Sequence, residues 1–130
     1  MDWYKESGKI MTINFNTTQS GIRAFQKAIE TNAENIANIQ TKNYKASRAN
    51  FIEGANGSIE VEIQKIETSG APLPPDQGEP GDEMSNVDIA EETVDLIKNK
   101  SALESNLKVL KRLDELIGNF IDIIGWKVET

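Results

Sequence analysis

The sequence predicts a mainly α-helical protein in which two long terminal helices form an antiparallel coiled-coil hairpin, with a small β segment and a Pro/Gly-rich loop between them. Apolar residues recur at helical spacing near both ends of the chain. The middle alternates apolar and polar residues and then enters a segment that holds all four prolines. Since only 38% of the 130 residues are hydrophobic, we expect a thin, elongated domain with a modest core.

The composition excludes several classes of function. The chain has no histidine and no cysteine, which removes Cys/His zinc sites, Ser-His-Asp and Cys-His nucleophile systems and disulfides. A net charge of −7 argues against non-specific binding to nucleic acid. No apolar run is long enough to insert into a membrane, and the start lacks the apolar core of a cleaved signal peptide. We therefore expect no catalysis, cofactor or metal.

The first predicted helix follows an irregular polar lead at residues 1–16. It begins at Thr17 within an N-terminal unit of residues 17–48, ends near Gln40, and spans about 23 residues or ~35 Å. Asn43 follows as a candidate left-handed residue, because asparagine tolerates positive φ. The apolar seam of this helix, expected to pack within the chain, consists of Ile22, Phe25, Ile29, Ile36 and Ile39.

The middle segment, residues 49–84, is expected to contain the β structure. Residues 57–67 alternate apolar and polar side chains as in a half-buried strand, and Phe51-Ile52 offers a partner strand. Residues 69–84 are expected to be a loop. The acidic residues of this loop lack the spacing of a calcium-binding loop, so a solvated acidic loop is the favoured interpretation.

The second predicted helix occupies residues 85–125 and is followed by a tail at residues 126–130. Ser85 and Asp88 resemble a capping box at its start. The helix is expected to span about 38 residues, or ~57 Å, which exceeds the reach of the first helix. Its apolar seam is expected to pack on the first helix through Leu103, Leu107 and Leu110.

A second apolar stripe makes the last turns of this helix apolar around most of the circumference. One interpretation is that the segment folds back under a loop, and the other is that further chains cover it. Asparagines at positions 32, 35 and 38 either fix the register of a coiled coil or lie on a solvated face. The residues expected at contacts between subunits are Asn35, Asn38, Ile117, Phe120, Ile121, Ile123 and Ile124.

Residues 33–45, AENIANIQTKNYK, resemble the N-terminal signature of the bacterial flagellar rod and hook protein family, ANNIAN-x-x-T-x-G-Y/F-K. Glu34 stands in place of an asparagine and Asn43 in place of the glycine. Residues 85–92, SNVDIAEE, followed by residues 101–106, SALESN, resemble the C-terminal signature. This chain lacks the arginine and tyrosine of the family's R-A-Y-x-A-N core. The short middle segment is most similar to proximal-rod members of the FlgC type.

This resemblance implies a structural subunit of the flagellar basal body that is exported by the flagellar type III apparatus without signal cleavage. It also implies that the terminal helices assemble with other copies and with other rod or hook subunits into a coiled-coil tube in the periplasm. The alternative is a soluble helical adaptor or export chaperone that forms a defined dimer. An enzyme is the third and weakest interpretation.

Overall fold

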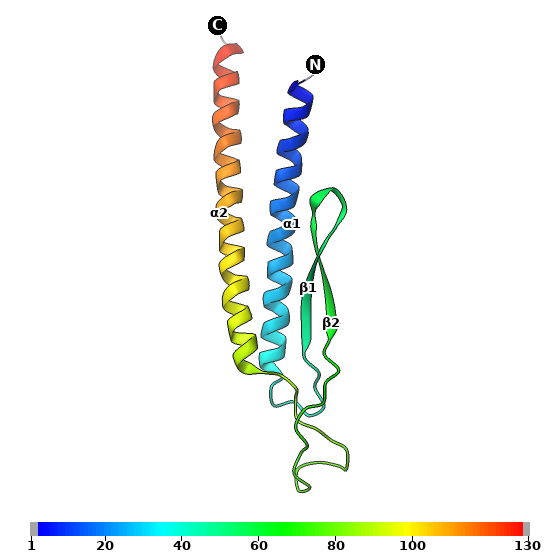
Figure 1. Ribbon diagram of the computed structural model, residues 1–130. Helices are drawn as coiled ribbons and strands as arrows, with labels where there is room; N and C mark the ends of the chain where they lie inside the picture. The colour runs from blue at the N-terminus through cyan, green and yellow to red at the C-terminus, as the bar shows by residue number, and fades with distance from the viewer. Residues whose placement is uncertain (1–2, 129–130) are drawn as a thin grey trace.

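The structure is a computed structural model that describes residues 3–128. Its elements in chain order are α1 (Trp3–Ala37), β1 (Ser47–Glu53), the 3-10 helix η1 (Ala55–Gly57), β2 (Ile59–Lys65) and α2 (Ile89–Val128). Figure 1 shows an elongated molecule in which α1 and α2 lie side by side and the two strands lie along α1. The prediction of a mainly helical protein with a small β segment is confirmed.

Helix α1 begins much earlier than expected. The irregular lead predicted for residues 1–16 is wrong from Trp3 onward, because α1 is continuous from Trp3 to Ala37. The physical reason lies in Phe15, which stands seven residues before Ile22 and continues the heptad seam onto the groove beside Leu107 and Leu110. With 35 residues in α1 and 40 in α2, the expected mismatch in helix length largely disappears.

The two strands form an antiparallel hairpin closed by η1. The register pairs Phe51 with Val61 and Ser47 with Lys65, so the partner strand suggested at Phe51-Ile52 is confirmed. Asn56 at the turn has φ 57, a left-handed conformation that asparagine adopts readily. One face of the hairpin lies on α1, where the ring of Phe51 is 4.9 Å from that of Phe25.

Small and polar residues fill the contact between α1 and its neighbours. Gly21 lies between α2 and β2, since a Cβ placed there would be 3.3 Å from Asn106 and 3.6 Å from Ile59. Ala24 and Ala28 are 4% and 1% exposed. The core is therefore a narrow line of short side chains that lets both α2 and the hairpin approach the backbone of α1 closely.

Helix α2 begins at Ile89, four residues later than predicted from Ser85. Asp88 is the capping residue, because its carboxylate accepts hydrogen bonds from the backbone N–H groups of Ala90 and Glu91. The preceding residue Asn86 is instead bound into the loop. The helix continues through the predicted tail to Val128, and residues 129–130 of that tail lie outside the described residues. Within residues 3–128, neither helix has a segment sufficiently long and apolar to span a membrane.

Candidate subunit interface and the base that supports it

A cluster of polar side chains joins the end of α1 to the start of α2 and the start of β1. We call this cluster the base. At its centre Asn35 is 0% exposed, and Asn32 and Glu92 are each 8% exposed. The members of the base are Asn32, Asn35, Tyr44, Ser47, Glu92 and Asn99.

Asn35 uses its full capacity for hydrogen bonds. Its amide nitrogen donates to Glu92 Oε1 at 2.9 Å and to the Ser47 carbonyl oxygen at 2.7 Å. Its oxygen accepts from the Ser47 N–H at 2.9 Å and the Tyr44 hydroxyl at 3.1 Å. The side chain therefore pairs with Ser47 as a neighbouring strand would, and it fixes where β1 starts on α1.

Glu92 holds the two helices in register. Each carboxylate oxygen accepts from a different asparagine of α1, Oε1 from Asn35 and Oε2 from Asn32 at 2.7 Å. Asn32 in turn accepts from the amide of Asn99 at 2.9 Å, one further contact between α1 and α2. Because a shift of α2 by one turn would leave a buried carboxylate without these donors, the cluster favours one alignment of the helices.

Tyr44 completes the base. Burial raises the pKa of its hydroxyl, and the negative charges of Glu34 and Glu92 raise it further. The neutral hydroxyl is thereby retained as the donor to Asn35. The tyrosine thus supplies a stable hydrogen bond where an ionised group would repel Glu92.

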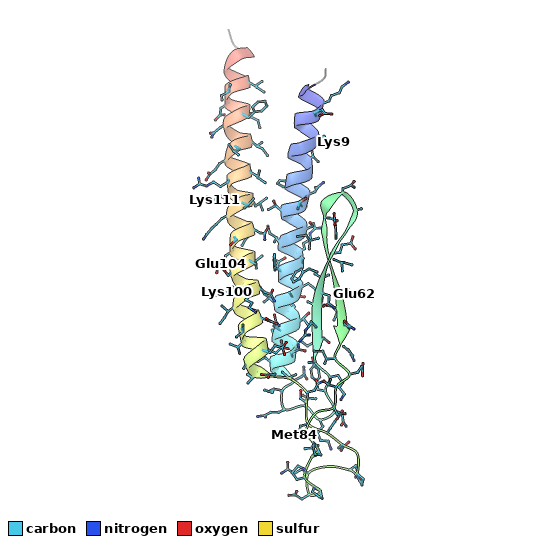
Figure 2. The ribbon with its side chains drawn as sticks, in the orientation of Figure 1. Lys9, Glu62, Met84, Lys100, Glu104 and Lys111 are labelled. Carbon is cyan, nitrogen blue, oxygen red and sulfur yellow. The ribbon has the colours of Figure 1, made fainter. Side chains whose placement is uncertain are left out.

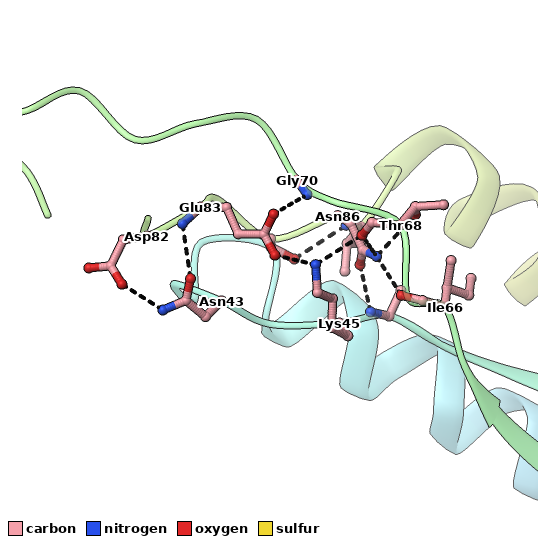
Figure 3. A network of polar contacts seen from close by, with 11 residues as sticks. Asn43, Lys45, Ile66, Thr68, Gly70, Asp82, Glu83 and Asn86 are labelled. Carbon is pink, nitrogen blue, oxygen red and sulfur yellow. Dashed lines mark hydrogen bonds and ion pairs between the residues drawn. The ribbon is translucent and has the colours of Figure 1, made fainter. Parts of the chain in front are cut away.

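The loop at residues 66–88 is fastened to the residues that follow α1, as Figure 3 shows. Asn43 has φ 57, the left-handed conformation expected for it. It pairs with Glu83 through both backbone and side chain, donating its N–H to the Glu83 carbonyl and accepting the Glu83 N–H on Oδ1, each at 2.9 Å. Its amide nitrogen also donates to Asp82. An asparagine at this position therefore binds the loop, which a glycine side chain could not do.

Two ion pairs strengthen this attachment. Lys42 lies 2.7 Å from Asp82, and Lys45 pairs with Glu83. The hydrogen bond from Lys42, followed by that from Asn43, lowers the pKa of Asp82 well below its usual value, and the hydrogen bond from Lys45 lowers that of Glu83. Both carboxylates are therefore bound in their charged form. We call these ion pairs and the Asn43 contacts the latch.

Asn86 ties the same loop to the hairpin. Its amide nitrogen donates to the carbonyl oxygens of Ile66 and Thr68, and its oxygen accepts the Ala46 N–H at 2.6 Å. Asn86 belongs to the C-terminal sequence signature and Ala46 follows the N-terminal one, so the fold brings the two signatures together.

The other end of α2 is apolar and exposed. We call residues 113–124 the free end. Leu116, Ile121 and Ile123 are each 61% exposed, Phe120 is 56% exposed and Ile124 is 46% exposed. Apolar side chains exposed along several consecutive turns are typical of a surface that binds another molecule.

The structure separates the residues predicted for the interface between subunits. Asn35 was expected there, and this expectation is wrong because the residue is fully buried within the chain. Asn38 is half-buried and bonds locally, to the Glu34 carbonyl and the Thr41 hydroxyl. Ile117 is half-buried. Only the exposed members Phe120, Ile121, Ile123 and Ile124 lie at a surface open to a partner.

The residues predicted to pack within the chain are mostly half-buried. Leu107 is the exception at 47% exposure. Phe25 was expected on the seam between the helices, and its ring also reaches the hairpin. The half-buried members are Ile22, Phe25, Ile29, Ile36, Ile39, Leu103 and Leu110.

Spacing of apolar residues gave no signal for Tyr44, Ser47, Glu92 and Asn99, which complete the base. The asparagines that recur in α1 were the available signal, because an asparagine side chain that is buried requires polar partners. In the described part of the chain, no group of three or more acidic side chains is arranged to hold a metal ion.

Comparison with known proteins gives two matches, one at each end of the chain. Residues 15–45 match the family model described as flagella basal body rod protein. Residues 82–123 match the model described as flagellar basal body rod FlgEFG protein C-terminal. No curated protein matches the chain. The two matched segments contain α1 residues 15–37, the latch, every member of the base except Ser47, and most of the free end.

Proposed function

We propose that the chain, which two flagellar basal body rod models match at residues 15–45 and 82–123, is a structural subunit that joins the rod through its two terminal helices. In this role the chain acts through its conformation and its surfaces. The base and the latch give one subunit a defined conformation, and the free end offers a surface for neighbouring subunits. Catalysis has no part in this role.

The observation that carries the proposal is the contrast between the two ends of α2. At its start, Glu92 is buried and bound by two asparagines of α1. At its end, Phe120 and Ile121 are 56% and 61% exposed. A helix that is fixed within the chain at one end and apolar at the other is suited to extend into a bundle made by several subunits.

We further propose that the two helices act as an antiparallel coiled-coil hairpin within a tube of such hairpins. The partners would be other copies and other rod or hook subunits, after export by the flagellar apparatus without signal cleavage. Figure 1 supports the hairpin, because the two termini lie at the same end of the molecule. Within the family, we propose a place among FlgC-type proximal-rod proteins from the short middle segment and the total length of the chain.

The test is recovery of the tagged chain with hook–basal bodies isolated from the flagellated bacterium that carries its gene. We expect the chain in the rod fraction, with rod subunits bound to it. A matched variant, Phe120→Glu, should be expressed and folded but absent from the rod fraction. If the wild-type chain is instead recovered only as a soluble dimer bound to export substrates, the adaptor or chaperone interpretation is correct.

A further inference from the structure

One face of the free end forms a continuous apolar stripe. Its members recur at intervals of four and three residues, the spacing of a single helix face. Leu113 is half-buried and the others are between 49% and 61% exposed. We call this face the outer stripe, and it consists of Val109, Leu113, Leu116, Phe120 and Ile123.

The hairpin packs on α1, on the side away from α2, and leaves the outer stripe of α2 uncovered. Its tip is fixed to α1 where the Thr17 hydroxyl donates to the Gly57 carbonyl oxygen at 3.0 Å and the Ile59 N–H donates to the Ser20 hydroxyl at 3.0 Å. Asn106 of α2 lies beside this tip, across Gly21. Figure 1 shows the hairpin ending partway along α1, with both helices continuing beyond it. The outer stripe thus begins at the level along the helices where the hairpin ends.

A candidate occupant lies at the opposite end of the molecule. The loop at residues 69–84 projects beyond the base (Figure 1), and its two arms pair through Pro72 and Glu83. Between the arms is an open hollow of about 600 Å³ whose lining includes Pro72, Leu73, Pro75 and Pro80. A hollow of this size and apolar character admits large apolar side chains such as those of Leu116 and Phe120.

The charges of the two surfaces are complementary. The loop carries four acidic residues and no basic residue between positions 69 and 84. Asp82 and Glu83 are used by the latch, while Asp76 and Glu79 are exposed. Beside the outer stripe, α2 carries three basic residues in five, at positions 108, 111 and 112. Lys111 projects away from the ribbon of α2 in Figure 2 and lines the groove beside Phe15, so Lys108 and Arg112 are the basic residues nearest the outer stripe. The side chain of Arg112 is 80% exposed and pairs with Glu115 at 2.9 Å within its own helix, a pair that docking of the loop would exchange for one with the loop.

We propose that the loop at residues 69–84 of one copy docks on the outer stripe of a second copy. This inference rests on the proposed role as an assembling subunit and adds which surfaces of two copies meet. Leu116 and Phe120 enter the hollow of the loop, and Asp76 and Glu79 face Lys108 and Arg112. With the copies parallel, as in the proposed tube, each contact leaves one loop and one outer stripe unoccupied, so copies join head to tail in an open chain. A closed antiparallel dimer, in which each loop lies on the partner's outer stripe, would contradict this arrangement.

The test uses two charge-reversal variants of the full chain. In Asp76→Lys/Glu79→Lys the loop becomes basic, and in Lys108→Glu/Arg112→Glu the edge of the outer stripe becomes acidic. Sedimentation velocity at rising protein concentration should show wild-type chains of increasing length. Each variant alone should associate more than about tenfold more weakly, because like charges then face each other. An equimolar mixture should regain association, since each loop again meets a stripe of opposite charge.

Glu60→Lys/Glu62→Lys is the matched control, because it makes the same change of charge on the exposed face of the hairpin. It should associate as the wild type does. The proposal is overturned if the wild type remains monomeric, if the loop variant associates normally, or if the mixture behaves like the separate variants. Recovery of such a wild-type chain in hook–basal bodies would still support the rod function, so the two proposals fail separately.

Discussion

The two ends of α2 differ in which side chains they bury. At the base, a carboxylate and two asparagines are buried and every bond of Asn35 is made within one chain. At the free end, isoleucines, a leucine and a phenylalanine are exposed to solvent. A buried polar cluster at one end and an exposed apolar surface at the other show that burial in this chain does not follow hydrophobicity.

The largest expected effect on stability comes from Asn35. Asn35→Leu keeps the branched shape of the side chain but leaves Glu92, Ser47 and Tyr44 without the partners that Asn35 supplies, so we expect the free energy of unfolding to fall by about 3 kcal/mol or more. Urea denaturation followed by circular dichroism measures this. Asn38→Ala is the matched control and should cost less than about 1 kcal/mol, because Asn38 bonds only to its own helix end. Equal losses in the two variants would contradict the central position of Asn35.

A smaller effect is expected at Glu92. Glu92→Gln keeps the shape but gives one asparagine of α1 an amide nitrogen in place of its acceptor, so we expect a loss of about 1–2 kcal/mol. Glu91→Gln, at the neighbouring position that pairs with Arg48 at the surface, should change stability by less than about 0.5 kcal/mol. If the two variants unfold at the same urea concentration, the carboxylate of Glu92 does not hold the helices in register.

The exposed apolar end of α2 could be anticipated from the sequence, whereas the base could not, and the reason is physical. Apolar spacing identifies faces that leave water, so the exposed stripe at Phe120 and Ile123 was recognised as a surface for other chains. Apolar spacing does not identify a buried amide whose hydrogen-bond partner is a carboxylate distant in sequence. Asn35 was therefore assigned to the interface between subunits, although it is buried within one chain. Its partner Glu92 lies 57 residues away, and only the fold brings the two together.

The helix boundaries were likewise predicted where local chemistry sets them and missed where contacts distant in sequence set them. The end of α1 and the left-handed Asn43 were predicted from local chemistry and are close to those observed. The start of α1 was missed, because residues 3–14 are largely polar and their helical state depends on continuing alongside α2. The start of α2 was displaced because Asn86 bonds to Ile66, Thr68 and Ala46, contacts that a local capping rule does not include.

The latch should respond to acid. The pKa values of Asp82 and Glu83 are lowered in the folded chain, so their charged forms stabilise the attached loop above the ordinary carboxyl range. That stabilisation is lost as pH falls below about 4 towards the lowered values. Nuclear magnetic resonance of the amides at residues 69–84 should show the loop detaching in acid before the helices unfold. In Asp82→Asn/Glu83→Gln the loop signals should no longer change over this pH range. Persistence of the change in that variant would assign it to other groups.

The smallest effect on stability is expected at the free end. Leu116→Glu/Phe120→Glu places charges on side chains that are already 61% and 56% exposed, so the free energy of unfolding should change by less than about 0.5 kcal/mol. Assembly should nevertheless be lost, because a partner would have to bury unpaired charges. Ile97→Glu, at a residue that is 64% exposed outside the free end, should assemble normally. A large loss of helicity in the double variant would place Leu116 and Phe120 in the core of the monomer.

Hydrogen exchange on a dilute, verified monomer tests the central claim most directly, because it measures the opening of each backbone amide separately. We predict strong protection in α1 from Ala24 to Asn35 and in α2 from Glu92 to Leu103, where the base holds the helices together. Amides at residues 113–124 should exchange much faster and become protected only when other subunits are added. Uniform protection of α2 through Ile123 in the isolated monomer would contradict the division between a base that folds alone and a free end that other chains complete.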